Sequence, residues 1–365
     1  MRRRSSYLAW LKDLLVKSEY SSTSDRVRFD LSGSGVPKKK LSDLPLTVKK
    51  IKINDFNLYG YRPLLEKIAN HYGVEWRNVV TTQGVSMANY LVFATLTNDK
   101  KEVLIETPTY EPIVAAAEFC GAKVKRFQRR FRNGYCLEQR EIVNKINRHT
   151  ALIVLTNLHN PSGIYIPSED LTQIGELARH FGASVLVDEV YLDSLIDANS
   201  VSAVHLGGNF IVTSSLTKVY GFDGLRAGWI VCDSKLAERI WRIHDLICNN
   251  GVVLAEKLST IVFKNINKYR KITIQLIENN LPLLAEFFDG QQTVEWIKPN
   301  GGTICFPKLV SSRKVKQLIQ TLENDYSVRV TDGGFFGAPN HIRIGFGVPT
   351  TILREALRRI SQAIE

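Results

Sequence analysis

The chain has 365 residues and a formal net charge of +12, from 48 lysines and arginines against 36 aspartates and glutamates. Its hydrophobic content of 44% is ordinary for a globular protein, and its length favours two domains with a substantial core. No apolar stretch is long enough to span a membrane, and the dispersed basic residues accompany no RNP, zinc-finger or helix-turn-helix pattern. We therefore expect neither a membrane nor a nucleic-acid partner.

The amino terminus combines a basic start with a helical pattern. After Met1–Arg4, the segment Tyr7–Val16 has leucines at positions 8, 11, 14 and 15 on one helical face. A transit peptide is disfavoured because Asp13 and Glu19 come early. We expect a helix that packs on the body of the protein or on a partner subunit.

The five cysteines are scattered along the chain and form no C-x-x-C pair. Neither a metal site nor a redox motif is indicated. An odd number of cysteines without a disulfide framework fits a reducing compartment, so we expect a cytoplasmic protein without a bound metal.

Short apolar segments alternate with helical patterns from about Leu41 to Gly251. This alternation predicts an α/β fold, with a mostly parallel sheet between two layers of helices. The clearest helices between strands are Tyr61–Tyr72 and Ser168–Phe181. The expected strands are Val79–Thr82, Glu102–Glu106, Lys123–Phe127, Ala151–Thr156, Ser184–Val187, Phe210–Thr213 and Gly228–Cys232.

The pattern changes beyond about residue 255 and predicts a smaller α+β domain. Lys264–Phe288 reads as one long helix that Pro282 kinks or interrupts. The elements expected after it are a helix over Arg313–Glu323, strands at Ser327–Thr331 and His341–Gly345, and a helix over Thr351–Ile364.

One lysine stands in a loop rich in serine, threonine and glycine. Ser215 lies three residues before Lys218, and Arg226 lies eight residues after it. A lysine amine can form a Schiff base with an aldehyde, and a hydroxyl with a guanidinium can hold a phosphate. An aldehyde and a phosphate on one molecule describe pyridoxal phosphate (PLP). By itself, the segment is equally compatible with a surface lysine and an arginine in a salt bridge.

Two further motifs follow apolar strands. Asp188 and Tyr191 come at the carboxyl end of Ser184–Val187, where ligands bind in open α/β sheets. The carboxylate could pair with the pyridinium nitrogen of PLP, and the phenol could bond the ring hydroxyl. Asn160 lies in an Asn-Pro-Ser-Gly sequence after Ala151–Leu155. A capping aspartate and a plain turn are the alternative interpretations.

Together the motifs resemble the fold-type I PLP-dependent aminotransferases of class I/II, over nearly the whole chain. Each motif is weak or moderate alone, whereas their order and spacing are specific. The segments that carry the resemblance are Gly84–Ser86, Pro108–Tyr110, Asn160–Gly163, Asp188–Tyr191, Ser215–Arg226 and His341–Gly345. It implies PLP as cofactor and a three-layer αβα large domain over residues 41–254. Residues 1–40 would join residues 255–365 in the small domain.

The resemblance implies a role for each matching residue. Lys218 would form the internal aldimine and move the α-proton, which requires a lowered pKa. Backbone N–H groups at the start of a helix would hold the phosphate. The residues implied for the phosphate are Gly84, Val85, Ser86, Ser215 and Arg226.

The remaining roles concern the ring and the substrate. Tyr110 would stack on the pyridine, and Asn160 would bond the ring hydroxyl beside Tyr191. Arg343 would grip the substrate α-carboxylate with its planar fork. A glycine near the amino terminus would contact substrate; Gly33 and Gly35 are both candidates, and Gly35 is our choice.

Members of this family usually form homodimers in which a tyrosine reaches the partner's phosphate. That tyrosine normally stands several residues before a glycine, whereas Tyr59 here directly precedes Gly60. We therefore expect a homodimer, with Tyr59 as the candidate for this role.

The leading hypothesis is an aminotransferase that acts on an α-amino acid and a 2-oxo acid by a ping-pong mechanism through Lys218. The first alternative is another PLP reaction on this fold, such as a carbon–sulfur lyase or a decarboxylase. The second is a non-catalytic module that senses an amino acid. Such modules usually carry a DNA-binding extension, for which the first thirty residues are too short. The sequence does not indicate which side chain the substrate carries.

Overall fold

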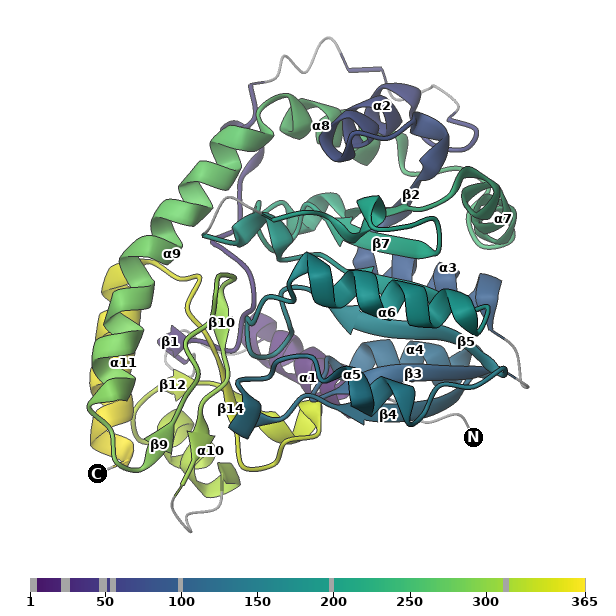
Figure 1. The fold of residues 1–365 in the computed structure, drawn as a ribbon. Helices are drawn as coiled ribbons and strands as arrows, with labels where there is room; N and C mark the ends of the chain where they lie inside the picture. Colours follow the sequence, from purple (N-terminus) through teal and green to yellow (C-terminus); the bar gives the residue numbers. More distant parts are fainter. Residues whose placement is uncertain are drawn as a thin grey trace.

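The computed structural model describes residues 5–20, 27–45, 51–52, 57–97, 101–196, 200–310 and 315–364. Its centre is a seven-stranded sheet with the order β2–β8–β7–β6–β5–β3–β4 (Figure 1). Strand β8 runs antiparallel to both of its neighbours, and the other pairs are parallel. The strands are β2 (Val79–Gln83), β3 (Glu102–Thr107), β4 (Lys123–Gln128), β5 (Thr150–Thr156), β6 (Ser184–Asp188), β7 (Phe210–Ser215) and β8 (Ala227–Val231).

Helices cover both faces of this sheet. In Figure 1, α5 and α6 cross in front of it, and α3 and α4 lie behind it. Helices α2 and α8 pack against each other near β2. The helices of this part are α2 (Arg62–Tyr72), α3 (Val85–Leu96), α4 (Glu111–Phe119), α5 (Gln139–Val143), α6 (Ser168–His180), α7 (Ser234–Asp245) and α8 (Val253–Lys264). The prediction of an α/β fold with a mostly parallel sheet is confirmed.

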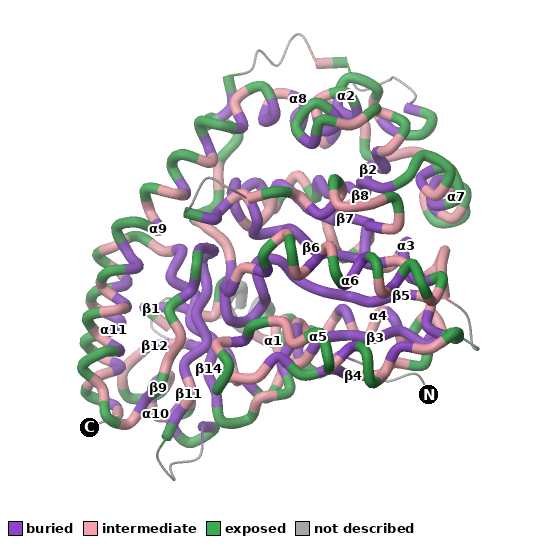
Figure 2. The backbone as a smooth tube through the Cα atoms, in the orientation of Figure 1, coloured by how far each residue is buried: buried purple, intermediate pink, exposed green. Residues whose placement is uncertain are grey.

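The central strands are buried along their length, which explains why their sequences are continuous apolar runs rather than alternating ones (Figure 2). Helix α6 approaches the sheet closely at Gly175, where an added Cβ would lie 2.4 Å from the ring of Phe210. All seven predicted strands are present, with ends that shift by one or two residues.

A second apolar cluster forms beside the large sheet, between α9, α10, α11 and several short strands. Strand β1 from the amino-terminal region pairs in parallel with β12. The elements are β1 (Phe29–Asp30), α9 (Ile266–Asp289), β9 (Val294–Glu295), β10 (Ile304–Cys305), β11 (Lys308–Leu309), α10 (Val315–Asn324), β12 (Val328–Arg329), β13 (Thr331–Asp332), β14 (Ile342–Gly345) and α11 (Thr350–Ile364). The division of the chain at residues 40 and 254 stays a prediction.

Two expectations for this part need correction in detail. Pro282 does not interrupt the helix, since α9 continues through it, with Leu281 and Leu284 buried beside it. The strand expected at Ser327–Thr331 is two short strands, because β12 pairs with β1 whereas β13 pairs with β14.

Helix α1 (Ser6–Tyr20) packs on the body of the protein, as one of the two expectations had it. The carboxylate of Glu111 accepts the backbone N–H of Tyr7 at 2.6 Å and that of Ser6 at 3.2 Å, which places negative charge at the start of the helix. The predicted leucine face is not the packing face throughout, since Leu8 is exposed and Tyr7 is buried. None of the described helices is both long and apolar enough to cross a membrane.

Candidate active site

A cavity of about 240 Å³ lies where several strands of the large sheet end. Eight of the residues predicted from the sequence line it: Val85, Ser86, Tyr110, Asn160, Asp188, Tyr191, Lys218 and Arg226. Six further residues were not predicted: Leu11, Ser34, Ile113, Thr156, Val190 and Thr217. Because parallel strands end at one edge of a sheet, polar residues far apart in the sequence meet there.

Lys218 extends its amine into this cavity. Its Nζ donates a hydrogen bond to Oγ of Ser34 at 2.8 Å. Burial, reinforced by the positive charge of Arg343, lowers the pKa of Lys218 to about 8. A larger share of this amine is therefore neutral near physiological pH than for a lysine in water.

The segment that carries Ser34 lies against the backbone of Lys218. The N–H of Val36 donates to the Lys218 carbonyl at 3.2 Å, and a Cβ added to Gly35 would lie 3.4 Å from the same oxygen. A Cβ added to Gly33 would meet no atom of the described residues within 4 Å. The residue of this segment that lines the cavity is Ser34, rather than either candidate glycine.

Asp188 ends strand β6 with a buried carboxylate. Its Oδ2 accepts from Nδ2 of Asn89 at 3.0 Å, and its Oδ1 accepts from the N–H of Val190 at 3.1 Å. Burial raises the pKa of Asp188 to about 6. The carboxylate can therefore be ionised at neutral pH and still accept a further hydrogen bond from the cavity.

Hydrogen bonds to neighbouring segments hold Tyr191 and Asn160 at the cavity. The Tyr191 hydroxyl donates to the Ser34 carbonyl at 2.7 Å, and burial raises the pKa of Tyr191 to about 12. The N–H of Asn160 donates to Oγ1 of Thr156 at 2.9 Å. Thr156 in turn donates to the buried carboxylate of Glu106 at 2.6 Å, which fixes the loop after β5.

The N-terminus of α3 and the guanidinium of Arg226 lie side by side. Gly84 caps this helix with a φ of +86°, and a Cβ there would lie 2.6 Å from Nη2 of Arg226. A Cβ on Gly228 would lie 2.4 Å from the carbonyl carbon of Gly84. Two glycines thus allow a helix N-terminus and a cation to converge, which is the chemistry of an anion site.

Ser215 does not line the cavity, although it was predicted to bind phosphate. It is fully buried, and its Oγ accepts the N–H of Thr217 at 3.3 Å. Thr217 lines the cavity in its place.

Arg343 on β14 is fully buried and makes no ion pair with a carboxylate within the described part of the chain. Its Nη2 donates to the Ser32 carbonyl at 3.0 Å, and its Nη1 lies 3.5 Å from Oδ1 of Asn160. Its Nε has no hydrogen-bond partner among the residues that the structure describes. Because a buried charge without a counter-ion is unfavourable, this site suits an anionic ligand.

Aromatic rings surround this guanidinium. The Phe336 ring lies 4.9 Å from it, and the hydroxyl of Tyr7 lies 3.4 Å from Nη2. The Tyr7 ring meets the Tyr110 ring edge to face, with centroids 5.2 Å apart. Tyr110 therefore lines the cavity with its position fixed by α1.

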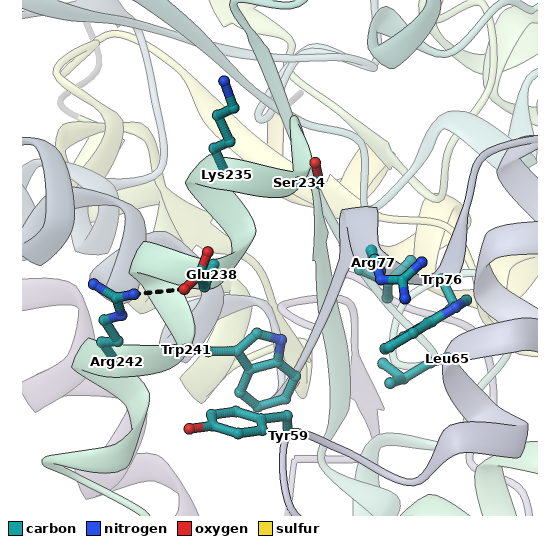
Figure 3. Close-up of a pocket in the computed structure, with 10 residues that line it drawn as sticks. Tyr59, Leu65, Trp76, Arg77, Ser234, Lys235, Glu238, Trp241 and Arg242 are labelled. Carbon is teal, nitrogen blue, oxygen red and sulfur yellow. Dashed lines mark hydrogen bonds and ion pairs between the residues drawn. The ribbon is translucent and has the colours of Figure 1, made fainter.

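Tyr59 lies elsewhere on the same chain. It is 52% exposed, and its ring meets that of Trp241 at 5.8 Å. Figure 3 shows the pair in a surface pocket of about 480 Å³, near the ion pair of Glu238 and Arg242. Tyr59 does not line the cavity of Lys218 within its own chain.

Several residues of the site were missed because their signals are weak. Thr156 is the last residue of an apolar strand, a position that could have been read as it was for Asp188. Asn89 lies four residues after Val85 on the same helix, so helical spacing could have placed it near the cavity. For Tyr7, Ser32 and Ser34 the sequence predicted a packed helix and a substrate-contacting glycine nearby, but not the particular contacts of these three side chains.

These groups fit PLP. The convergence of Gly84 and Arg226 suits a phosphate, the amine of Lys218 suits an aldehyde, and the orphaned Nε of Arg343 suits a carboxylate on the substrate. A cavity with these groups, at the strand ends of a sheet covered by helices on both faces, has the features that a fold-type I PLP-dependent enzyme requires.

Residues 38–360 match the model of the family described as "Aminotransferase class I and II", so the chain belongs to that family, whose cofactor is PLP. Capreomycidine synthase from Streptomyces vinaceus is 28% identical over 290 residues, which are 78% of this chain and 74% of that protein. Arginine–pyruvate transaminase from Pseudomonas aeruginosa is 26% identical over 314 residues, which are 83% and 80% of the two chains.

The fold is similar to that of solved structures. A PLP-dependent aminotransferase from Streptococcus suis superposes with a TM-score of 0.91 at 21% identity, covering 99% of this chain and 97% of the other. At this identity the likeness concerns the fold, and the reaction has to be argued from the site.

Proposed function

We propose that this protein is an aminotransferase that moves an amino group between an α-amino acid and a 2-oxo acid. The observation that carries the proposal is the buried guanidinium of Arg343, which has no carboxylate partner among the described residues and whose charge acts on the amine of Lys218. A carboxylate bound to Arg343 would hold the substrate's Cα within reach of that amine.

Each polar group of the cofactor, and the face of its ring, has a candidate partner in the cavity. The first turn of α3 and Arg226 would hold its phosphate, and Tyr110 would lie against its ring. Asp188 would face the ring nitrogen, with Asn160 and Tyr191 near the ring oxygen. When bound, PLP supplies an electron sink for the negative charge left on the substrate Cα.

Lys218 has two tasks in this proposal. Its neutral amine would hold the cofactor through the aldehyde carbon, with the aldehyde oxygen leaving as water, and once a substrate amine took its place the freed amine would accept the proton from Cα. A pKa near 8 suits both tasks, because the amine must lose and regain a proton near neutral pH. The hydroxyl of Ser34, which accepts from Nζ, would orient the amine between steps.

Arg343 and α1 would position the substrate. The guanidinium is buried, with the ring centroids of Tyr7 and Phe336 at 5.9 and 4.9 Å, and the exclusion of water strengthens its attraction for a carboxylate. Leu11, one turn after Tyr7, lines the cavity together with Ile113. The substrate side chain would meet these apolar residues.

We also propose that the protein acts as a homodimer in which Tyr59 reaches the phosphate in the partner's site. Large exposed apolar side chains are compatible with an interface, since Leu58, next to Tyr59 in the chain, is 68% exposed, Leu246 82% and Val252 55%. Sedimentation should give twice the chain mass, and Tyr59→Phe should weaken PLP binding. A fully active monomer would refute the dimer.

The relative named capreomycidine synthase supports a second candidate, a PLP-dependent reaction other than amino transfer. One experiment separates the two. The PLP-loaded protein is given a panel of amino acids with no 2-oxo acid. An aminotransferase stops after one equivalent of 2-oxo product per site and resumes when 2-oxoglutarate is added. Continuous turnover without an acceptor would identify a lyase or a synthase instead.

A further inference from the structure

Asn89 links the helix that begins at Gly84 to the carboxylate of Asp188. It lies on α3, is 4% exposed, and donates from Nδ2 to Oδ2 of Asp188 at 3.0 Å. Its Oδ1 accepts from Oγ1 of Thr213, which is fully buried on β7, at 2.8 Å. Thr213 and Asp188 are direct neighbours in the register of β7 and β6.

The two hydrogen bonds fix which way the side-chain amide of Asn89 is turned. The Thr213 hydroxyl donates to the amide oxygen of Asn89, so the amide presents its N–H to Asp188. If the amide were turned over, its oxygen would face the carboxylate and repel it, unless Asp188 carried a proton. The pair of hydrogen bonds therefore favours an ionised Asp188.

We propose that Asn89, oriented by Thr213, is a positioning residue that keeps Asp188 ionised and aimed at the ring nitrogen of PLP. The inference rests on the role proposed above for Asp188. Because Asn89 lies four residues after Val85, one helix would set both ends of the cofactor, the phosphate through its first turn and the ring nitrogen through Asn89.

The surrounding charges show why such a bond matters. Burial of Asp188 disfavours its ionised form, and the carboxylate of Glu106 adds to this, whereas the Lys218 cation opposes it. The other titratable groups that interact with it, Glu189, Tyr110 and Tyr191, would gain negative charge if ionised and would also disfavour it. When Lys218 is neutral, the N–H groups of Asn89 and Val190 still stabilise the ionised carboxylate of Asp188.

Two variants test the hydrogen bonds from Thr213 to Asn89 and from Asn89 to Asp188. Asn89→Leu removes the amide with little change in size, and Thr213→Val removes only the hydroxyl. The matched control is Thr95→Val on the same helix, where the lost hydroxyl bonds the carbonyl of Leu91 and does not reach Asp188. Each purified apoprotein is titrated with PLP and with 1-deazapyridoxal phosphate, in which a carbon replaces the ring nitrogen.

We expect Asn89→Leu to bind PLP roughly 10-fold more weakly, as for a lost hydrogen bond to a charged group, and to bind the deaza analogue as the wild type does. Thr213→Val should show a smaller loss of the same kind, and Thr95→Val none. In both Asn89→Leu and Thr213→Val, the nitrogen-15 chemical shift of bound, ring-labelled PLP should move toward the value of an unprotonated pyridine.

Other outcomes overturn the inference. Equal weakening of PLP and the analogue would make Asn89 a packing residue, and unchanged PLP binding with an unchanged nitrogen signal would remove its role. If Asn89→Leu does not fold, Thr213→Val decides by the same criteria. A wild type that binds PLP but does not distinguish it from the analogue would refute the role of Asp188 itself, and hence the inference.

Discussion

The hydroxyl of Tyr7 lies 3.4 Å from Nη2 of Arg343, although the two residues are 336 positions apart in the chain. Helix α1 is anchored at this point, because Glu111 accepts hydrogen bonds from the N–H groups of its first turn. Glu111 directly follows Tyr110, whose ring contacts Tyr7. The amino-terminal helix is thus built into the wall that would receive the substrate.

Replacing Tyr7 by phenylalanine should affect substrate binding and spare the cofactor. The ring remains, and only the hydroxyl beside Arg343 is lost, so KM for the amino acid should rise roughly 2- to 10-fold with little change in kcat. Steady-state kinetics and a PLP titration measure the two effects. Tyr326→Phe is the matched control, since its hydroxyl bonds the Gln362 carbonyl far from the site. An unchanged KM would limit Tyr7 to packing.

Lys218→Ala should abolish covalent attachment of PLP. Borohydride reduction of the loaded wild type should place the label on the peptide that contains Lys218, and peptide mapping by mass spectrometry detects it. Lys235→Ala, which removes an exposed lysine, should leave the labelling intact. Label on another lysine in the wild type would contradict the proposed chemistry.

Arg343→Ala should weaken amino-acid binding while PLP remains bound. The loss of a buried, bidentate carboxylate contact should cost about 2–5 kcal/mol of binding free energy. Spectral titration of the loaded protein with amino acids gives this quantity. Arg358→Ala on the exposed face of α11 serves as the control. An unaltered response to amino acids would relegate Arg343 to a structural role.

The rate at which the apoprotein captures PLP should rise with pH and level off above about 8. The neutral amine of Lys218 is the attacking group, and its pKa is lowered to about 8 by burial and by Arg343. In an unfolded chain the amine of Lys218 has a pKa of about 10.4. The free energy of unfolding should therefore increase as the pH rises from about 8 to about 10.4, and this gain should be absent below pH 8. Stopped-flow absorbance and urea unfolding measure the two effects. A capture rate that does not change with pH would contradict the lowered pKa.

The buried ion pair of Glu106 and Arg129 should be sensitive to the loss of either partner. Nη1 of Arg129 lies 3.0 Å from Oε2 of Glu106, and both side chains are almost fully buried. Arg129→Met leaves an uncompensated carboxylate and should lower the free energy of unfolding by about 3–5 kcal/mol. Urea denaturation tests this. In the exposed pair of Figure 3, Arg242→Met should change stability by no more than about 1 kcal/mol.

Much of the large sheet could be predicted, because a strand buried on both faces must be apolar along its length. Val185–Val187 and Ile211–Val212 carry that signature locally, and the polar residues directly after such strands necessarily meet at one edge. The prediction was less accurate where an element changes partner. The strand around Val330 divides because β12 and β13 pair with different strands, a choice that no local pattern encodes.

By itself, the sequence determined the α/β class, the family and the residues at the strand ends, Asp188, Asn160 and Lys218, because those features depend on local order and spacing. Only the tertiary structure decided that Ser34 meets Lys218, that Tyr7 meets Arg343 and that Asn89 meets Asp188. Each of these contacts joins segments about a hundred or more residues apart. A single hydroxyl or amide has no periodicity in the sequence, and its partner is set by how the packed helices and strands bring distant segments together.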